Sequence, residues 1–289
     1  MAVALVGAIP WWAKIAGKLL LSRLPVPREC WRKLGIFQHG SMRDPGYALE
    51  VFTSHYARLE PYLPKPFVVL ELGPGDSLAS ALVAQAYGAS SIFLVDAGRF
   101  ATTDVEPYRR LARILQQRGI GSRTPEFRSV DEMLARTNAT YLTDGLKSLA
   151  SMSSGRVDFV FSQAVLEHVP LAEFRETVGQ LARIQKAGGV ASHRVDFQDH
   201  LAHSLNSLRF SRAVWESACF AKSGFYTNRL RASEVLAMFS EAGHEILARH
   251  EDRWPAAPLS RTRLHPDFHR FSDEVLLIRG MDLVCRKRV

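Results

Sequence analysis

A segment near residue 70 restricts the fold more than any other part of the chain. Residues 67–76 form a short apolar stretch that runs into the turn Gly-Pro-Gly-Asp. Leu78, Leu82 and Ala86 then recur at the spacing of one helical face. The two glycines of the turn provide the conformational freedom and the close approach that a ligand above it needs. The segment therefore predicts a strand, a tight turn with a ligand site, and a helix.

A second apolar strand, residues 91–96, ends in Asp96, 25 residues after Glu71. This spacing places an acid at the carboxyl end of the neighbouring parallel strand, where it can accept hydrogen bonds from a ribose diol.

Strand and helix patterns continue to alternate along the chain. The pattern predicts strands at residues 140–143, 157–162 and 190–195, a helix at 171–184 that Gly188 and Gly189 stop, and a last strand at 274–285 paired with 244–249. Alternation of this kind predicts an α/β fold with a mainly parallel sheet and helices on both faces.

The composition is that of an ordinary globular protein. The chain has 289 residues, a net charge of +8, 47% hydrophobic and 23% charged residues, and too little Gly and Pro for a fibrous or disordered chain. Its three cysteines, Cys30, Cys219 and Cys285, are odd in number and widely spaced, so they indicate neither a disulfide framework nor a Cys-x-x-Cys site. We therefore expect a reducing, cytoplasmic location.

The apolar and basic segments do not indicate a membrane span or a nucleic-acid partner. Residues 77–95 carry no charge, but Gly88 to Ser91 interrupt them, and residues 1–13 lack the early positive region of a signal peptide. Residues 1–60 hold eight Lys/Arg and four Asp/Glu, yet no dense basic tract occurs.

Two domains are expected: an N-terminal helical extension at residues 1–60 and a main domain at 61–289. Residues 9–24 contain Trp11, Trp12, several leucines and spaced cations. They fit either a helix that packs on the protein's own body or a peripheral helix at the inner face of a membrane. The extension is also a candidate lid.

Three motifs taken together resemble the class I S-adenosylmethionine (SAM)-dependent methyltransferases. They are the 71–76 turn, Asp96 at the end of the next strand, and residues 157–169 followed by a helix that ends at 186–189. The match spans about residues 66–195. It implies a Rossmann-like, seven-stranded sheet whose last strand is antiparallel, with SAM as cofactor and S-adenosylhomocysteine as product.

The resemblance also implies a cofactor site, position by position. It consists of Glu71, Gly73 and Gly75 at the methionine and ribose, Asp96 at the ribose hydroxyls, Ala97 and Gly98 near the adenine, Thr143, Asp144 and Gly145 at the adenine edge, and Gln163 and Ala164 beside the sulfonium. A nicotinamide site fits less well, because the turn lacks the third glycine of the G-x-G-x-x-G pattern. A purely structural turn capped by Asp76 is the other alternative.

Residues 193–200 are the densest candidate for acceptor chemistry, since they hold His193, Asp199 and His200, with His203 close behind. A hydroxyl acceptor benefits from a base, which histidine supplies near neutral pH. We name His193, Asp199 and His200 as catalytic candidates, with Asp199 and His200 as the base pair. A divalent metal site, which we do not favour, and a polar loop are the alternatives.

Further side chains are candidates for acceptor binding. His168 fits either acceptor contact or orientation of the next helix. Asn228, Arg229 and Arg231 fit either a donor set for a carboxylate or phosphate or the start of a helix. His39 is either part of a lid or structural.

A looser resemblance connects residues 37–47, 193–200 and 226–231 with bacterial methyltransferases of glycan and surface-polysaccharide assembly. It implies O-methylation of a sugar-containing or small-molecule acceptor. Two alternatives remain. One is an RNA methyltransferase, which only the pI of about 9.6 supports. The other is a non-catalytic binding protein anchored through Trp11 and Trp12. The segment 254–271 is expected to be a long connection that covers the acceptor side.

Overall fold

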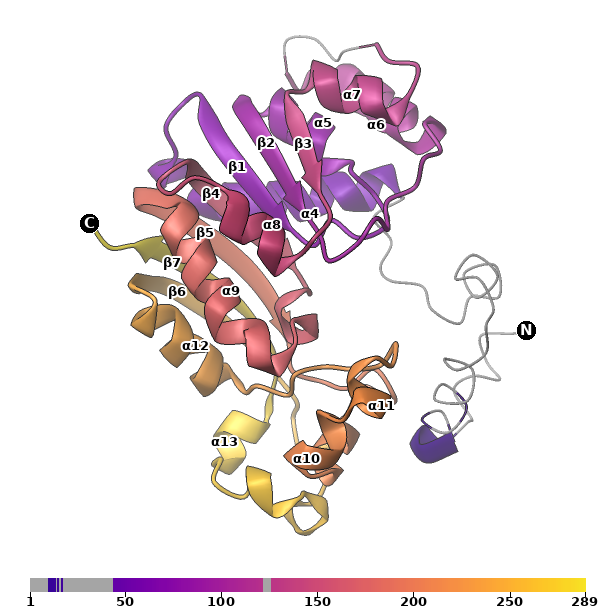
Figure 1. The fold of residues 1–289 in the computed structure, drawn as a ribbon, viewed down its shortest axis with the longest axis vertical. Coiled ribbons are helices and arrows are strands. Elements are labelled where there is room, and N and C mark those ends of the chain that lie inside the picture. The colour runs from indigo at the N-terminus through magenta and orange to yellow at the C-terminus, as the bar shows by residue number, and fades with distance from the viewer. Residues whose placement is uncertain (1–9, 14, 16, 18–43, 122–125) are drawn as a thin grey trace.

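A seven-stranded sheet forms the centre of the described structure (Figure 1). The computed structural model describes residues 10–13, 15, 17, 44–121 and 126–289. The strands are β1 (Phe67–Leu72), β2 (Ala89–Val95), β3 (Ala139–Leu142), β4 (Val157–Gln163), β5 (Gln185–Asp196), β6 (His244–Arg253) and β7 (Ile278–Lys287).

The strand order is β3-β2-β1-β4-β5-β7-β6. Pairs within β1 to β5 are parallel, whereas β7 runs antiparallel to both β5 and β6. The last strand is thus antiparallel, as the resemblance to class I methyltransferases implied, and it lies between β5 and β6. The predicted fold class is confirmed.

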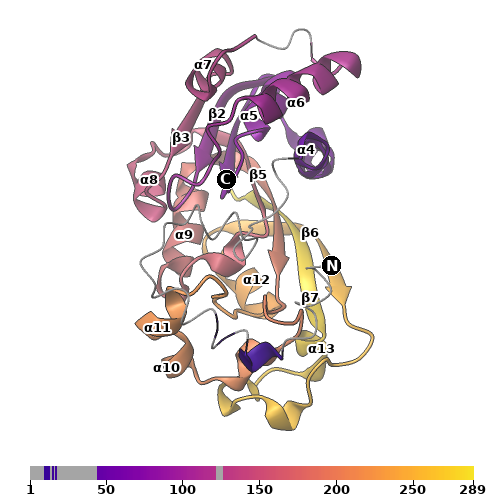
Figure 2. The ribbon, with the colours of Figure 1, turned by 90° about the vertical axis from the view of Figure 1, so that its right-hand side faces the viewer.

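Helices cover both faces of the sheet (Figure 2). One face carries α4 (Pro45–Leu59), α5 (Ser80–Ala86) and α6 (Glu106–Gln117), and the other carries α8 (Leu146–Ser151), α9 (Leu171–Ile184) and α12 (Ala232–Glu241). The predicted helix at 171–184 is confirmed as α9, because its apolar stripe Phe174, Val178, Leu181 and Ile184 is buried. Beside β3 lies α7 (Val130–Arg136).

Helix α4 belongs to the core of the main domain, although it lies within residues 1–60. Asp44 caps its first turn by accepting a hydrogen bond from the Gly46 amide. Phe52 is fully buried and packs edge-on against Phe161 of β4, with ring centroids 5.6 Å apart.

Residues 197–231 and 254–277, on either side of α12 and β6, form the lower end of the molecule in Figure 1. They contain α10 (Arg212–Trp215), α11 (Ala218–Ala221), α13 (Asp273–Leu276) and the 3₁₀ turns η3 (Asn206–Arg209), η4 (Arg261–Arg263) and η5 (Pro266–Phe268). Leu259, Leu264, Phe268 and Phe271, from the expected long connection, are buried in a small apolar cluster there. The connection therefore has a core of its own.

A second small cluster takes in the N-terminal residues that the structure describes. Ile15 is buried among Leu201, Trp215, Phe225 and Tyr226. Trp11 meets the Phe210 ring edge-on at 6.2 Å, whereas the Trp12 side chain is 61% exposed. These contacts fit packing on the protein's own body; membrane contact stays a prediction. No helix among the described residues has the length and apolarity that a membrane crossing requires.

Two strand boundaries differ from the predictions. β7 begins at Ile278 instead of residue 274, because Ser272 accepts a hydrogen bond from the Val275 amide and starts α13. β5 begins at Gln185, so the glycine pair lies within the strand and does not precede it. The register shifts there, and a Cβ on Gly189 would lie 2.9 Å from the Lys186 carbonyl oxygen. The glycines thus permit a bulge.

Candidate active site

The candidate site lies at the carboxyl ends of β1, β2 and β4. The chain leaves β1 toward β2 and β3 on one side, while β4 and β5 lie on the other. In open α/β sheets, ligands bind at such a switch point, outside the carboxyl ends of the strands.

The glycine turn after β1 closes tightly against its neighbours. Gly73 and Gly75 have φ of 72° and 67°, which favours glycine. The Gly73 amide donates to the Val95 carbonyl of β2 at 2.7 Å. A Cβ on Gly73 would lie 2.5 Å from the Val165 methyl groups, so the loop after β4 touches this turn.

Asp96 joins the turns after β1 and β2. Its Oδ2 accepts a hydrogen bond from the Gly75 amide at 2.9 Å, and its Oδ1 accepts one from the Ala97 amide at 2.7 Å. Burial raises the pKa of Asp96, and these two amides oppose the rise. A carboxylate has about four acceptor sites, so two amide bonds leave room for a diol. Asp96 thus lies next to the glycine turn at the carboxyl end of β2, and its role toward a ribose stays a prediction.

Glu71 lies at the end of β1 and is buried, with its carboxylate accepting a hydrogen bond from the Ser80 hydroxyl. Burial raises its pKa to about 8; the Ser80 hydrogen bond opposes this rise, and Asp96 adds to it. A carboxyl group that keeps its proton near pH 7 can donate as well as accept hydrogen bonds.

The residues expected near adenine lie together. The Gly145 amide donates to the Asp96 carbonyl at 2.8 Å, and its backbone has φ of 53°. The Tyr141 hydroxyl donates to the Gly98 carbonyl at 3.1 Å. Between these points, the Asp144 amide donates to the Ser148 hydroxyl, and Thr143 is half-buried. The loops after β2 and β3 therefore form one edge of the site, with Ala97 between them.

Gln163, the last residue of β4, and Ala164 after it lie beside a histidine that the sequence analysis missed. His55 of α4 donates from Nε2 to Gln163 Oε1 at 3.0 Å, and its Nδ1 accepts from the Ser192 hydroxyl at 2.7 Å. Burial lowers the pKa of His55 to about 4. Ala164 has φ of 53° and donates to the Arg194 carbonyl at 3.0 Å. The only sequence signal for His55 was a histidine on an apolar helix face.

Two of the three catalytic candidates, His193 and Asp199, are buried and form hydrogen bonds with other parts of the protein. His193 lies inside β5 and not in the loop after it; it is fully buried, and its Nδ1 lies 2.8 Å from the Ser162 hydroxyl. Burial lowers its pKa to about 3. Asp199 is buried and accepts hydrogen bonds from the amides of residues 201, 202 and 206. His200 is exposed, and its ring stacks on that of His168 at 4.9 Å.

Asn228, Arg229 and Arg231 are buried and bind backbone carbonyls. Asn228 donates to the carbonyls of Leu166 and Val169. Arg229 donates to those of Ser207 and Phe210, and Arg231 to those of Phe197 and Ile278. These bonds hold the loops that surround the site in place. His39 lies outside the described residues.

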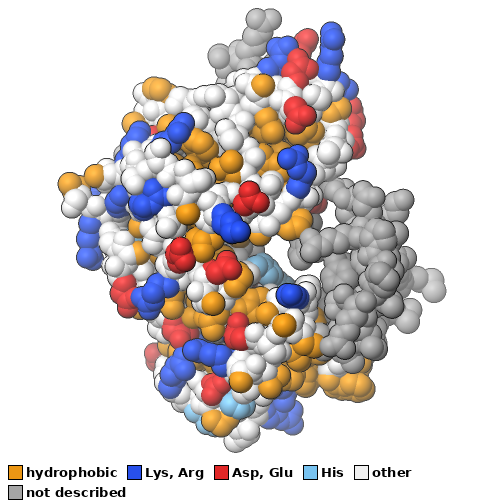
Figure 3. All heavy atoms as spheres, in the orientation of Figure 1, with side chains coloured by type: hydrophobic (Ala, Val, Ile, Leu, Met, Phe, Trp, Pro, Cys, Tyr) orange, Lys and Arg blue, Asp and Glu red, His pale blue; other side chains and the backbone are white. Residues whose placement is uncertain are grey.

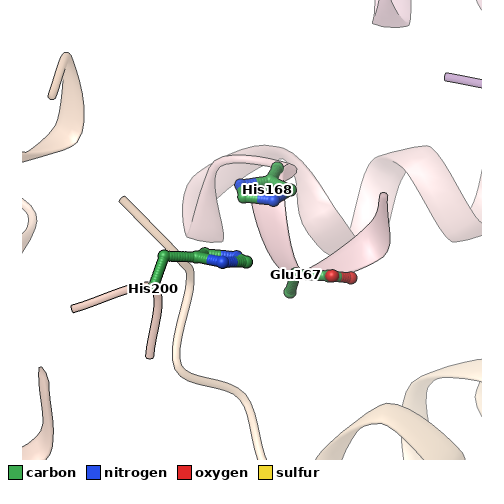
Figure 4. A group of neighbouring side chains, drawn as sticks. All are labelled: Glu167, His168 and His200. Carbon is green, nitrogen blue, oxygen red and sulfur yellow. The ribbon is translucent and has the colours of Figure 1, made fainter. Parts of the chain in front are cut away.

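Glu167, His168 and His200 form a cluster just beyond Val165 (Figure 4). One ligand atom from each lies within 4.8 Å of the others. Burial, together with the charge of Asp196, raises the pKa of Glu167 well above its usual value; the amides of Glu167 and Asp196 oppose the rise. Sequence reasoning singled out His168 and passed over its neighbour, although an acid in an apolar segment after a strand was a usable signal.

In Figure 3, histidine side-chain atoms are visible near the middle of the face that is drawn, and acidic and hydrophobic side chains surround them.

No family model and no curated protein sequence matches this chain. Solved structures are similar to it at low identity. A SAM-dependent methyltransferase from Methanosarcina mazei is 17% identical, with 81% of this chain and 98% of that chain covered and a TM-score of 0.49. A SAM-dependent methyltransferase from Mesorhizobium loti is 13% identical, with 80% and 97% covered and a TM-score of 0.45.

Proposed function

We propose that this protein is a SAM-dependent methyltransferase that methylates a hydroxyl oxygen of a sugar-containing or other small acceptor. The observation that carries the cofactor part is Asp96. Its buried carboxylate lies at the carboxyl edge of β2 and accepts the Gly75 amide of the turn after β1. This arrangement supports binding of a nucleoside's ribose diol beside the glycine turn.

Methyl transfer to an oxygen is an in-line displacement. The acceptor oxygen forms a bond to the methyl carbon, the carbon–sulfur bond breaks, and sulfur keeps that electron pair as the thioether of S-adenosylhomocysteine. The hydroxyl proton leaves the acceptor oxygen in the same reaction. The protein's main tasks are to align the two reactants and to assist this proton's departure.

The acceptor side is assigned to the loops after β4 and β5. His168 and His200 stack on each other there, and Val165 links the first loop to the Gly73 turn. The carboxylate of Asp199 already accepts hydrogen bonds from three backbone amides. We therefore infer that His168 and His200, and not the pair Asp199 and His200, assist removal of the proton.

The test of the cofactor site is calorimetric titration of the purified protein with S-adenosylhomocysteine. We expect one site with micromolar affinity, about −8 kcal/mol, that is lost in Asp96→Ala. Asp131→Ala, on the exposed side of α7, is the matched control and should bind normally. A folded wild-type protein that does not bind, or an Asp96→Ala variant that binds equally well, overturns the proposal.

The acceptor is tested by incubating the protein and labelled SAM with a panel of glycans and small hydroxyl compounds. Methyl incorporation should fall in His200→Gln while S-adenosylhomocysteine affinity is retained. Equal rates for the two proteins would remove His200 from the reaction.

A further inference from the structure

Glu167 presents a buried carboxyl group next to two histidines. It lies in the 3₁₀ turn η2 (Leu166–His168) directly after β4, and only 3% of its surface is exposed. Neither of its carboxylate oxygens forms a hydrogen bond of ordinary geometry with the described residues. Buried carboxylates are normally hydrogen-bonded, paired with a cation or bound to a metal.

The neighbouring histidine is oriented as metal ligands usually are. His168 Nδ1 lies 3.1 Å from the Tyr226 carbonyl oxygen. A carbonyl oxygen only accepts hydrogen bonds, so Nδ1 carries the hydrogen and the lone pair of the neutral ring is on Nε2. Metal-binding histidines commonly donate their second N–H to a carbonyl in this way, which fixes the tautomer and the ring.

His200 brings a second imidazole to the same place from the loop after β5. Its ring is nearly parallel to that of His168, with an interplanar angle of 15°. Figure 4 shows the two rings one above the other, with Glu167 beside them. The three ligand atoms lie within 4.8 Å of one another. Ligands of a tetrahedral zinc ion lie roughly 3.4 Å apart, and imidazole lone pairs lie in the ring plane, so the exposed His200 has to move inward and tilt out of its parallel stack on His168 before both rings can point at one cation.

We propose that Glu167, His168 and His200 bind one divalent transition-metal cation. Two imidazoles and one carboxylate suit zinc, iron or cobalt, whereas magnesium and calcium prefer oxygen ligands throughout. The cation supplies the positive charge that the buried Glu167 carboxylate otherwise lacks.

The role of the cation rests on the proposed function. A hydroxyl bound at an open coordination position loses its proton more readily, because the cation stabilises the alkoxide. The proton then passes to solvent, and His168 and His200 assist as ligands. The cluster is well placed for this, because the loop that carries Glu167 and His168 touches the Gly73 turn through Val165.

The test is titration of the chelator-treated full chain with Co²⁺, without SAM, followed by its visible absorption bands. We expect one Co²⁺ per chain, displaced by Zn²⁺. Loss of a ligand in Glu167→Gln or His200→Asn should weaken binding about 10-fold to 100-fold or more, judging from the cost of losing an outer-shell partner. His203→Asn, an exposed histidine of the same loop, should leave it unchanged.

A wild-type protein that takes up no Co²⁺, or equal binding by all four proteins, overturns the metal site. His200→Asn keeps this test open if Glu167→Gln does not fold, because His200 is exposed. Failure here is distinct from failure of the methyltransferase proposal, since S-adenosylhomocysteine binding is measured separately.

Discussion

The backbone amide of Gly75 donates a 2.9 Å hydrogen bond to Oδ2 of Asp96. This bond connects the turn after β1 with the first residue after β2, and the Gly73 amide reinforces it by donating to Val95. The two turns are therefore fixed to each other by the chain itself, so the candidate cofactor site is shaped before any ligand enters.

The first prediction compares the two glycines of that turn. Gly73→Ala and Gly75→Ala both place a side chain at positive φ, which costs about 1 to 2 kcal/mol. Only the new Cβ at residue 73 meets Val165, at 2.5 Å, whereas nothing lies within 4 Å at residue 75. Urea unfolding should therefore show Gly73→Ala to be less stable by a further 1 to 3 kcal/mol, roughly the cost of overpacking.

The Val165→Ala substitution tests the cause of that difference. Added to Gly73→Ala, it removes the two methyl groups that the new Cβ meets, so it should recover part of the lost stability. A double variant that shows simple additivity would mean that the Val165 contact is not responsible.

Glu71 should make the free energy of unfolding decrease as pH rises. Its pKa is raised to about 8, so the folded protein keeps a proton that the unfolded chain releases above its ordinary value of 4.5. The group's contribution to the free energy of unfolding is therefore full below pH 4.5 and decreases as pH rises to 8. Relative to the wild type, Glu71→Gln should gain about 1.4 kcal/mol per pH unit in this window. A constant difference between the two would contradict the assignment.

The buried His244 should have the opposite effect and make the free energy of unfolding decrease as pH falls. Burial lowers the pKa of His244 from 6.5 to about 4, so below pH 6.5 the unfolded chain takes up a proton that the folded protein does not. Its contribution to stability is present above pH 6.5 and decreases as pH falls to 4. His244→Gln should therefore gain about 1.4 kcal/mol per pH unit relative to wild type as pH falls. Curves of unfolding free energy against pH that stay parallel for the two proteins between pH 4 and 6.5 would show that burial does not hold His244 neutral.

Arg231 should be important for stability. Its guanidinium is buried and donates to the carbonyls of Phe197 and Ile278, both at 2.7 Å. Arg231→Met removes the guanidinium donor from both carbonyl oxygens, at a cost of about 3 kcal/mol. Arg249→Met, whose side chain is 58% exposed, should cost less than about 1 kcal/mol. Equal unfolding midpoints would show that Arg231 is not needed to hold these loops.

The sequence predicted the fold best where the spacing of apolar residues and glycines along the chain itself determines the local structure. The strands β1, β2 and β4 and helix α9 follow from apolar runs and helical spacing, and the glycine turn from positive φ. The hydrogen bonds of Arg231 could not be predicted from the sequence, because its partners Phe197 and Ile278 are 34 and 47 residues away along the chain. A pair of arginines near a helix start has the same sequence pattern whether it faces a ligand or a buried carbonyl.

Asp199 and His200 show a further limit of sequence reasoning. Adjacent residues in a loop point in directions that the backbone sets, so proximity along the chain does not make a base pair. The carboxylate of Asp199 turns toward backbone amides of residues 201 to 206, while His200 stacks on a residue from another loop. His168 and His200 are 32 positions apart, and only the parallel order of β4 and β5 brings them together.

Tyr226 has contacts on three sides. Its carbonyl accepts from His168, its hydroxyl accepts from the Leu171 amide and donates to Glu216, and its ring packs in the cluster that buries Ile15. The first described residues of the chain are thereby coupled mechanically to an imidazole of the candidate site. We therefore expect that substitutions at Ile15 change the position of the His168 ring from a distance, without altering any residue of the site.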